Sequence, residues 1–306
     1  MKRLVVLLGP TGVGKTDYSL SLAEKLGSPI ISADSRQIFR ELPIGTAAPT
    51  AEQQARVRHY FVATHSIHDN YSAGQYETEC LQLLDELFTT HDELLLTGGS
   101  MMYIDAVCRG FDNIPSVNPE VRQRVAELYR QRGLDFLVEE LKRLDPEHYQ
   151  RIDRQNHQRV MRALEVCYQT GEPYSSFRTG KQRQRPFVIE KIGLTRPREE
   201  LYQRINQRVD MMLEQGLLDE VKRVLPYRHL NSLNTVGYKE LFPFFDGMTT
   251  LDAAIEQIKT DSRHYAKRQM TWFRADTSIR WFNADEPTVD EILSGSLTMK
   301  NVMQKR

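Results

Sequence analysis

The segment GPTGVGKT, at residues 9–16, contains the residue types that bind phosphate groups. Its glycines allow a tight turn whose amide hydrogens point at phosphate oxygens, and the helix expected after it offers its positive end to the same anion. The ammonium of Lys15 would reach the terminal phosphate, and the hydroxyl of Thr16 would ligate a magnesium ion. The pattern predicts a phosphate loop, as in nucleotide-binding and ATP-binding proteins, formed by Gly9, Pro10, Thr11, Gly12, Val13, Gly14, Lys15 and Thr16.

A second polar cluster lies at the end of the apolar run 29–34 and contains Asp34, Ser35 and Gln37. In open α/β sheets, ligands bind beyond the carboxyl ends of the strands, so this cluster is expected to face the same crevice as the phosphate loop. Asp34 is then a candidate general base or metal partner. The alternative is that its carboxylate only caps the turn that follows.

A third stretch, Gly98, Gly99 and Ser100, directly follows an apolar run at residues 93–97. ATPases place a magnesium-binding aspartate at the end of such a strand. Residues 97–100 offer no carboxylate, so nucleotide hydrolysis is disfavoured. The glycines would instead allow a substrate to approach closely, with Ser100 as a small hydrogen-bonding group.

These residues need a scaffold in which strands and helices alternate. Apolar runs predict strands at residues 4–8, 29–34, 59–64, 93–97 and 187–195, and helical spacing predicts helices after the phosphate loop, after Ser72, from Pro197 and over 251–274. Residues 120–180 show helical spacing without strands. We expect an α/β fold, a P-loop NTPase-like parallel sheet flanked by helices. Residues 1–117 and 187–306 would form this core, and 118–186 a small all-helical insertion domain.

Two arginines in the helix after Pro197, Arg204 and Arg208, are spaced by four and project from one helix face. That geometry could clamp a diphosphate from the side opposite the loop. Pairing with Glu200 or Asp210 is an equally good interpretation.

Local clusters of basic residues are the other candidate binding surfaces. Gln158, Arg159 and Arg162 lie within about one helical turn. A basic run contains Arg178, Lys181, Arg183 and Arg185, and the helix 251–274 combines a mostly apolar stripe with a basic side that includes Lys267 and Arg268. Such faces suit a nucleic-acid backbone, although ordinary solvated surface explains them too.

The bulk composition does not by itself indicate nucleic acid. The 306 residues contain 41 basic and 41 acidic side chains, for a net charge of zero. The three cysteines are widely spaced, which favours reduced, buried thiols and a cytoplasmic location over disulfides or zinc. No segment reaches the roughly 20 apolar residues of a membrane span. Residues 299–306 form a polar and basic tail.

Eight segments together resemble one family, the bacterial tRNA dimethylallyltransferases (tRNA isopentenyltransferases). They are GPTGVGKT from Gly9, SADSRQIF from Ser32, IGTAAP from Ile44, TGGSMMY from Thr97, QRVMRALEV from Gln158, GLLDEV from Gly216, TVGYKE from Thr235 and YAKRQMTWFR from Tyr265. The resemblance implies transfer of a dimethylallyl group from its diphosphate to the exocyclic amine of the adenosine 3′ to the anticodon, with Mg²⁺. Departures from the usual pattern occur at Phe39, Ala48, Ser100 and His157.

The resemblance also assigns roles to residues. It makes Asp34 the proton acceptor for the adenosine amine and gives Ser100 a place in the catalytic centre, while Arg204 and Arg208 would join the phosphate loop in binding the diphosphate. The target base would be flipped out of the anticodon loop. The expected tRNA contacts, partly from the resemblance and partly from the basic helix, are Asp34, Ser35, Arg36, Gln37, Ser100, Arg122, Gln158, Arg159, Val160, Met161, Arg162, Gly237, Tyr238, Lys239, Lys267 and Arg268.

Two other functions compete with this reading. A small-molecule kinase of the nucleoside or shikimate type would share the loop and sheet but transfer a γ-phosphoryl group. A non-catalytic RNA-binding protein could keep the loop as a relic, although the intact Lys15, Thr16 and Asp34 argue against it. The favoured hypothesis is a monomeric, cytoplasmic prenyltransferase whose partners are tRNA and dimethylallyl diphosphate.

Overall fold

A single parallel sheet organises the chain. The computed structural model describes residues 1–180 and 183–285, so Lys181 and the basic tail 299–306 lie outside the described residues. The strands are β1 (Arg3–Leu8), β2 (Ile30–Ala33), β3 (His59–Tyr60), β4 (Glu93–Gly98), β5 (Val188–Thr195) and β6 (Arg280–Asn283), in the spatial order β3-β2-β4-β1-β5-β6. All neighbours pair in parallel, as the α/β prediction requires.

Two strand predictions were wrong. The strand expected over 59–64 ends after Tyr60, because Phe61 and Ala63 adopt left-handed backbone angles, with φ of 61° and 53°. The edge strand β6 was not predicted. It begins shortly after the long helix that ends at Arg274. Phe282 is its buried apolar residue, so the alternation of apolar and polar residues that predicts a strand is short and weak.

Side chains of the central strands alternate between two apolar layers. Leu4, Val6 and Leu8 of β1 pack in the larger cluster, with α3 (Ala73–Leu87) and α4 (Met101–Arg109). Val5 and Leu7 point to the other face, where α1 (Lys15–Leu26) and the first part of α9 (Arg198–Glu214) cover the sheet. Both faces of β1 are therefore apolar, which explains its continuous hydrophobic run.

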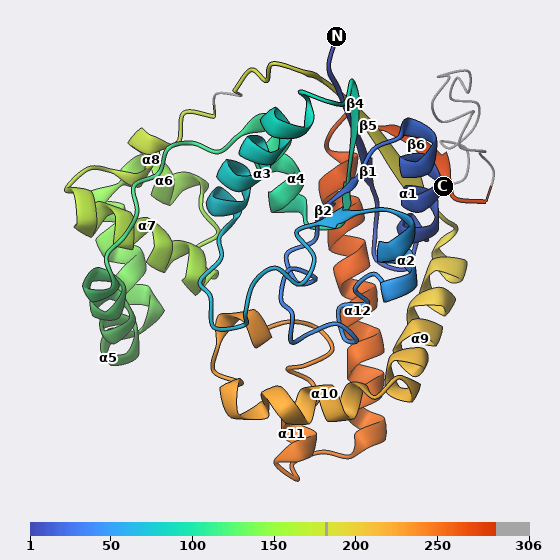
Figure 1. Cartoon of the computed structure of the whole chain (residues 1–306). Helices are drawn as coiled ribbons and strands as arrows, with labels where there is room; N and C mark the ends of the chain where they lie inside the picture. Colours follow the sequence, from blue (N-terminus) through green and yellow to red (C-terminus); the bar gives the residue numbers. More distant parts are fainter. Residues whose placement is uncertain (181–182, 286–306) are drawn as a thin grey trace. The chain divides into compact units, whose positions relative to one another are not determined.

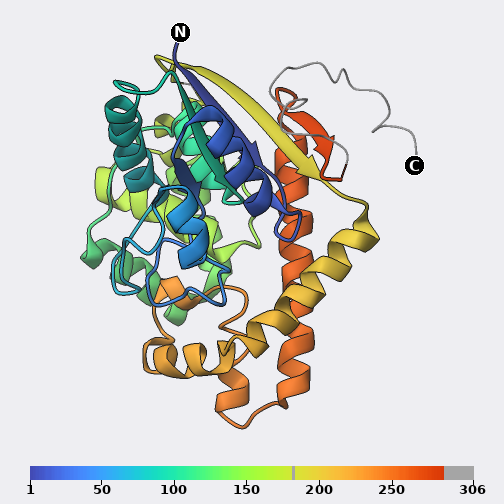
Figure 2. The ribbon, with the colours of Figure 1, turned by 45° about the vertical axis from the view of Figure 1, so that its right-hand side comes forward.

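The helices around the sheet begin at recognisable signals. The hydroxyl of Ser72 accepts a hydrogen bond from Gln75 and caps α3, and Thr50 and Gln53 form a capping box at α2 (Ala51–Arg56). The other elements are α10 (Leu217–Val224), η1 (Leu225–Tyr227), η2 (Asn231–Leu233), α11 (Phe242–Phe245) and α12 (Leu251–Arg274). Helices α9 and α12 lie side by side in both views (Figures 1 and 2), so the chain beyond β5 contributes two long helices to the core unit.

Residues 109–184 form a separate compact unit, and the remainder of the chain forms the other. The helical unit contains α5 (Pro119–Leu144), α6 (Pro146–Arg151), α7 (His157–Thr170) and α8 (Tyr174–Phe177), and α5 is broken at Gly133, where φ is 77°. It begins earlier than the predicted residue 118. The reason is that the amide of Arg183 donates to the carbonyl of Arg109, and Asp112 accepts from Thr179, so the two ends of the insertion hold each other.

The core of the helical unit is a small apolar cluster with one buried carboxylate. Val125, Leu137, Leu141 and Leu164 are fully buried. Asp145, also fully buried, accepts hydrogen bonds from the amide of His148 and from the amide and hydroxyl of Ser175, which joins the start of α6 to α8. This carboxylate is thus satisfied by neutral donors.

Two further sequence predictions concern residues away from the site. The basic run 178–185 does not form one solvated face, because Arg185 is buried, pairs with Glu77 at 2.9 Å and donates to the carbonyls of Ala106 and Val107. All three cysteines are buried and none forms a disulfide, as expected. Within residues 1–180 and 183–285, no helix is both long and apolar enough to cross a membrane.

Candidate active site

The phosphate loop lies between β1 and α1, as predicted. Gly14 precedes α1 with a left-handed φ of 103°, a conformation that a side chain would strain. The Lys15 ammonium donates to the carbonyls of Gly9 and Pro10, both at 2.9 Å, and holds the loop closed. Burial and, to a smaller extent, the nearby Arg208 charge lower the pKa of Lys15 from 10.5 to about 8, and the Asp34 charge partly opposes them. The loop thus has a positive charge that favours an anion.

Three arginines, one just before α9 and two within it, donate hydrogen bonds to this loop. They differ in whether a carboxylate pairs with them. Arg196 donates to the carbonyl of Val13 and forms ion pairs with Glu200 and Asp285. Arg204 donates to the carbonyl of Gly12 at 3.0 Å. To the described residues, Arg208 makes two long hydrogen bonds, 3.3 Å to the hydroxyl of Thr11 and 3.4 Å to the carbonyl of Thr46.

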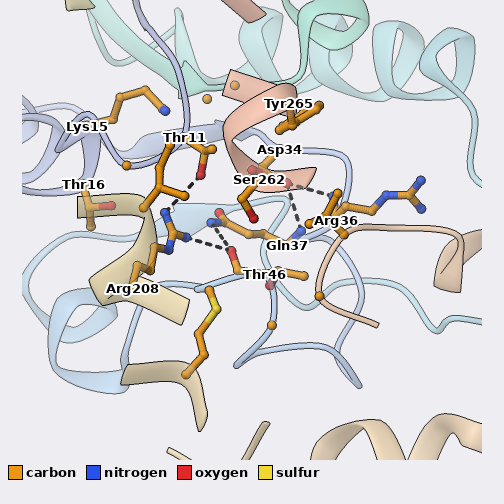
Figure 3. A pocket seen from close by; sticks show the side chains of 18 of the residues that line it. Thr11, Lys15, Thr16, Asp34, Arg36, Gln37, Thr46, Arg208, Ser262 and Tyr265 are labelled. Atoms are coloured by element: carbon orange, nitrogen blue, oxygen red, sulfur yellow. Dashed lines mark hydrogen bonds between the residues drawn. The ribbon is translucent and has the colours of Figure 1, made fainter. Parts of the chain in front are cut away.

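Arg204 and Arg208 therefore do not pair with the acids that the sequence offered as alternatives. Glu200 binds Arg196, and Asp210 binds Lys259 at 2.9 Å. Among the residues that the structure describes, neither arginine has a carboxylate within ion-pair distance. Burial lowers the pKa of Arg208, and Asp34 partly offsets that effect. Figure 3 shows the Arg208 side chain reaching toward Thr11 and Thr46.

The position of Asp34 fits both of the roles that the sequence left open, capping the turn and acting as a base. One carboxylate oxygen, Oδ1, accepts from the amides of Arg36 at 2.9 Å and Gln37 at 3.3 Å, which caps the turn after β2. The other oxygen has no hydrogen-bond donor in the described parts of the chain, and Asp34 lines the same cavity as Lys15. Capping fixes the orientation of the carboxylate and leaves one oxygen available as a base.

Ser100 lies next to this turn. Its hydroxyl accepts from the amide of Ser35 at 2.7 Å and donates to the Ser35 hydroxyl at 3.0 Å. The side chain of Arg36 turns away, donating to the carbonyls of Asn231 and Ser232. The Gln37 amide donates to the carbonyls of Thr46 and Ala47. Ser35, Arg36 and Gln37 therefore hold the Asp34 turn between neighbouring loops.

Helix α12 contributes three site residues that the sequence reasoning missed: Ser262, Tyr265 and Gln269. Gln269 is buried, accepts from the amide of Thr11 at 2.9 Å and donates to the carbonyl of Gly99 at 2.8 Å, so it joins the phosphate loop to the loop after β4. Burial and, second, the nearby Asp34 charge raise the pKa of Tyr265 to about 12. The available signal was their position: three polar residues interrupt the otherwise apolar stripe of this helix.

Tyr238, a predicted tRNA contact, has a fully buried side chain that does not reach the surface. Its hydroxyl donates to Glu220 at 2.6 Å, and Glu220 accepts from the amides of Ile44 and Gly45. A Cβ on Gly45 would lie 2.6 Å from the Tyr238 ring, so only glycine allows this approach. The network positions the loop whose Thr46 carbonyl contacts Arg208 and Gln37.

These residues line one cavity of about 620 Å³. Phosphate-loop residues and Arg204 and Arg208 form its cationic part, and Asp34, Ser262 and Tyr265 form another part of the wall (Figure 3). A second cavity of about 520 Å³ shares Ser35, Arg36 and Tyr265 with the first and is also lined by Ser100. Aromatic rings border it, including Tyr103, whose ring stacks on that of Tyr76. The two cavities meet around the Asp34 turn.

The predicted tRNA contacts divide by exposure. Arg122, Gln158 and Arg159 are exposed on the helical unit, and Lys239, Lys267 and Arg268 are exposed on the core unit. Val160 is fully buried in the core of the helical unit, so its side chain does not contact a ligand at the surface. Met161 packs partly against the same core, Arg162 pairs with Glu165 at 3.4 Å, and Gly237 is buried, its amide donating to Glu240.

The protein residues alone do not form a metal cage. No group of three or more His, Cys, Asp or Glu side chains that could hold a metal is present in the part of the chain described by the structure. Thr16 is exposed and is the second residue of α1, next to Lys15. Mg²⁺ accepts this kind of site, in which phosphate oxygens and water supply most ligands and the protein supplies few.

A sequence comparison decides the family. The profile of the IPP transferase family matches residues 37–276, most of the chain. The chain belongs to the IPP transferase family. A relative from Porphyromonas gingivalis named tRNA dimethylallyltransferase 2 is 60% identical over 288 residues, covering 94% of this chain and 96% of its own. One of the same name from Parabacteroides distasonis is 58% identical over 286 residues, with 94% and 96% coverage.

Solved structures agree with this family assignment. The tRNA isopentenylpyrophosphate transferase of Bacillus halodurans superposes with a TM-score of 0.70 at 35% identity, covering 96% of this chain and 94% of that one. A eukaryotic dimethylallyltransferase described as acting on tRNA has a TM-score of 0.80 at 26% identity, with 93% and 74% coverage. The P-loop NTPase-like fold and the resemblance inferred from the eight segments are both confirmed.

Two departures from the usual IPP transferase pattern have a structural account. Ser100 keeps the hydroxyl that binds the turn after Asp34. His157 stacks on Tyr129, with ring centroids 5.3 Å apart and planes 7° from parallel, so it joins α5 to the start of α7. Neither departure removes a group from the cavity that contains Asp34 and Lys15.

Proposed function

We propose that this protein transfers a dimethylallyl group from dimethylallyl diphosphate to the exocyclic N6 amine of the adenosine 3′ to the anticodon in tRNA. One observation carries the proposal within the family. Among the described residues, Arg204 and Arg208 have no carboxylate partner and one oxygen of Asp34 has no donor, and these groups border the same cavity. The first suits a leaving diphosphate, and the second suits an amine that must lose a proton.

The reaction follows from these two groups. The bond between C1 of the dimethylallyl group and the diphosphate oxygen breaks, and its electron pair leaves with the diphosphate. The N6 lone pair forms the new bond to C1. The amine proton passes to the free oxygen of Asp34, whose position is fixed by the Arg36 and Gln37 amides.

The cationic wall stabilises the diphosphate as its charge increases. Loop amides, Lys15 and Arg208 supply this field, and Arg204 adds charge at Gly12. A magnesium ion, when bound at the Thr16 hydroxyl, supplies further positive charge to the leaving group. A γ-phosphoryl transfer is not favoured, because β4 ends without the aspartate that kinases and ATPases of this fold place there.

The second cavity suits the target base. Its aromatic border offers stacking surfaces, Ser100 lines it, and the wall formed by Ser35, Arg36 and Tyr265 separates it from the cavity that contains Asp34. An adenosine must leave the anticodon-loop stack to enter it. We place tRNA contacts on the exposed Arg122, Gln158 and Arg159 of the helical unit, and on Lys239, Lys267 and Arg268 of the core unit. The buried, reduced cysteines fit a cytoplasmic enzyme.

The direct test is incubation with unmodified tRNA, dimethylallyl diphosphate and Mg²⁺, followed by digestion and mass spectrometry of the nucleosides. We expect one prenylated adenosine per tRNA molecule, at the position 3′ to the anticodon. Omitting tRNA controls for hydrolysis of the isoprenoid. Unmodified adenosine at that position after complete incubation with folded protein would contradict the proposal.

A further inference from the structure

The side chain of Gln269 connects two loops that line the phosphate-loop cavity. It is 1% exposed, and both of its polar ends bind main-chain groups. The carbonyl oxygen accepts from the amide of Thr11 at 2.9 Å, and the amide nitrogen donates to the carbonyl of Gly99 at 2.8 Å. Because one partner is only a donor and the other only an acceptor, they fix the orientation of the Gln269 amide.

The two loops are also packed closely around this side chain. A Cβ on Gly99 would lie 2.4 Å from Nε2 of Gln269 and 3.7 Å from the carbonyl oxygen of Gly9, the first residue of the phosphate loop. That same Gly9 carbonyl accepts from the ammonium of Lys15. A side chain at position 99 would therefore displace the Gln269 amide from the place where it joins the loops.

On its other side, the loop after β4 is bonded to the residues that flank Asp34. The amide of Ser100, which follows Gly99, donates to the carbonyl of Ala33 at 3.1 Å. The hydroxyl of Ser100 accepts from the amide of Ser35 at 2.7 Å. A continuous series of hydrogen bonds and adjacent residues thus runs from the phosphate loop through Gln269 to the main chain on both sides of Asp34.

The bond to Gln269 also removes one amide from the set that can bind an anion. The Thr11 amide is occupied, whereas the amides of Gly12 and Gly14 have no acceptor among the residues that the structure describes. These two amides, Lys15 and the arginines of α9 are groups that would bind the diphosphate in the proposed reaction. Replacing Gln269 therefore leaves the anion-binding groups in the chain and removes the connection between the loops.

We propose that Gln269 is a positioning residue, which fixes the place of the diphosphate-binding loop relative to the carboxylate of Asp34. This inference rests on the proposed function, because that function makes the diphosphate the leaving group and Asp34 the proton acceptor. A displacement of about 1 Å between reacting groups lowers a rate by up to about 10²-fold, while each substrate alone still meets its own binding groups. Gln269 should therefore affect the transfer step more than the binding of dimethylallyl diphosphate.

The alternative is that Gln269 only stabilises the fold. Gln269→Met has a side chain of similar length that forms neither hydrogen bond, and Gln257→Met, at an exposed position of the same helix, is the matched control. Rapid-quench single turnover at saturating tRNA and dimethylallyl diphosphate measures the rate per folded protein, and calorimetry measures the isoprenoid affinity. We expect Gln269→Met to lower the rate about 10- to 100-fold and to change the affinity by less than about three-fold. Gln257→Met should match the wild type in both.

Gln269→Glu tests the hydrogen bonds themselves. A protonated carboxyl group offers a carbonyl acceptor and a hydroxyl donor, as the amide does, whereas a carboxylate offers only acceptors and opposes the carbonyl of Gly99. The ratio of the single-turnover rate of this variant to that of the wild type should therefore rise as the pH is lowered from 8 to 6. Taking the ratio at each pH cancels the titration of the charged cavity groups that both proteins share, chiefly Lys15, Asp34, Arg204 and Arg208.

The outcomes separate this inference from the proposed function. Wild-type prenylation together with an unchanged rate in Gln269→Met would overturn the role of Gln269 alone. An affinity loss as large as the rate loss would also overturn it, because Gln269 would then belong to the anion site. If Gln269→Met does not fold, a rate ratio of Gln269→Glu that stays constant between pH 8 and pH 6 would have the same consequence. Absence of prenylated adenosine with the wild type would overturn the proposed function itself.

Discussion

The phosphate-loop cavity and the helical unit differ in whether their arginines are paired with acidic residues. In the cavity, the guanidinium of Arg208 is largely buried and contacts only a hydroxyl and a carbonyl, with no acid in ion-pair distance among described residues. In the helical unit, exposed arginines pair with acids one turn away, such as Arg143 with Glu140 at 3.0 Å and Arg130 with Glu127 at 2.8 Å.

The difference shows which charges are reserved for a ligand. Burying an unpaired cation is costly for folding, and an anion that enters the cavity offsets that cost. An exposed pair within one helix contributes little to stability and leaves the helix surface nearly neutral. The cavity should therefore bind one anion strongly, whereas the helical unit should bind tRNA weakly through its exposed Arg122 and Arg159 and not through the paired arginines. The predictions below test this comparison, from the largest expected effect to the smallest.

Asp34→Asn should lower the single-turnover rate of prenyl transfer by about 10²- to 10⁴-fold, the usual range for loss of a general base. The asparagine carbonyl can still accept from the amides of Arg36 and Gln37, so the turn should persist. Rapid-quench measurement at saturating tRNA and dimethylallyl diphosphate checks the rate, and filter binding should show unchanged tRNA affinity. A variant with nearly wild-type rate would remove Asp34 from the proton transfer.

Arg208→Met should weaken binding of dimethylallyl diphosphate by about 10- to 100-fold, because it removes a largely buried charge from the anion site. The same change should stabilise the unliganded protein, since no carboxylate loses a partner. Isothermal titration calorimetry and thermal unfolding measure the two effects.

Arg143→Met is the matched control for that change. It removes an arginine that is paired with Glu140 and exposed on the helical unit. Its diphosphate affinity should equal that of the wild type. Equal losses in the two variants would show that overall charge, and not the cavity, determines diphosphate binding.

The pH dependence of diphosphate binding should follow Lys15, whose pKa is lowered from 10.5 to about 8, chiefly by burial. Above pH 8 the free protein loses this charge, so affinity for dimethylallyl diphosphate should fall about three- to ten-fold between pH 7 and pH 9. The contribution of Lys15 to folding stability has the opposite sign. Between pH 8 and 10.5 the unfolded chain retains the proton that the folded protein has lost, so stability rises with pH.

Arg208 provides a check on this assignment. Its charge is the second cause of the lowered Lys15 pKa. In Arg208→Met, the midpoint of the pH dependence should therefore move upward, even though the affinity is lower throughout. A midpoint that stays in place would mean that another group controls the titration.

The smallest single effects are expected at the exposed tRNA contacts. Arg122→Ala and Arg159→Ala should each weaken tRNA binding by a few-fold and reduce the slope of log affinity against log salt by about 0.7 to 0.9. Dimethylallyl diphosphate binding should not change. Fluorescence titrations at several salt concentrations measure the slopes, and slopes equal to that of the wild type would make these residues ordinary surface.

Local sequence signals predicted most of the core unit. The phosphate loop, the cap at Ser72 and the helix over 251–274 were all recognisable because each depends on residues within a few positions of one another. The strand β6 and the early end of β3 were not, because the first depends on pairing with β5 and the second on left-handed residues that are not glycine.

Site residues that belong to a local sequence motif were predictable. Site residues that come together from distant segments of the chain were not. Lys15 and Asp34 lie in recognisable patterns. Gln269 accepts a hydrogen bond from the amide of Thr11 in the phosphate loop, 258 positions away in the sequence. Glu220 accepts one from the amide of Ile44, 176 positions away. The burial of Tyr238 depends on that same long-range network, which explains why a resemblance alone placed it at the tRNA surface.

The most direct measurement is a competition in one vessel that contains the protein, Mg²⁺, unmodified tRNA, dimethylallyl diphosphate and ATP. Nucleoside mass spectrometry and nucleotide chromatography then follow both possible reactions. The account predicts prenylated adenosine and inorganic diphosphate in equal amounts, with ADP at the level of a protein-free control. Accumulation of ADP with the isoprenoid unconsumed would contradict it.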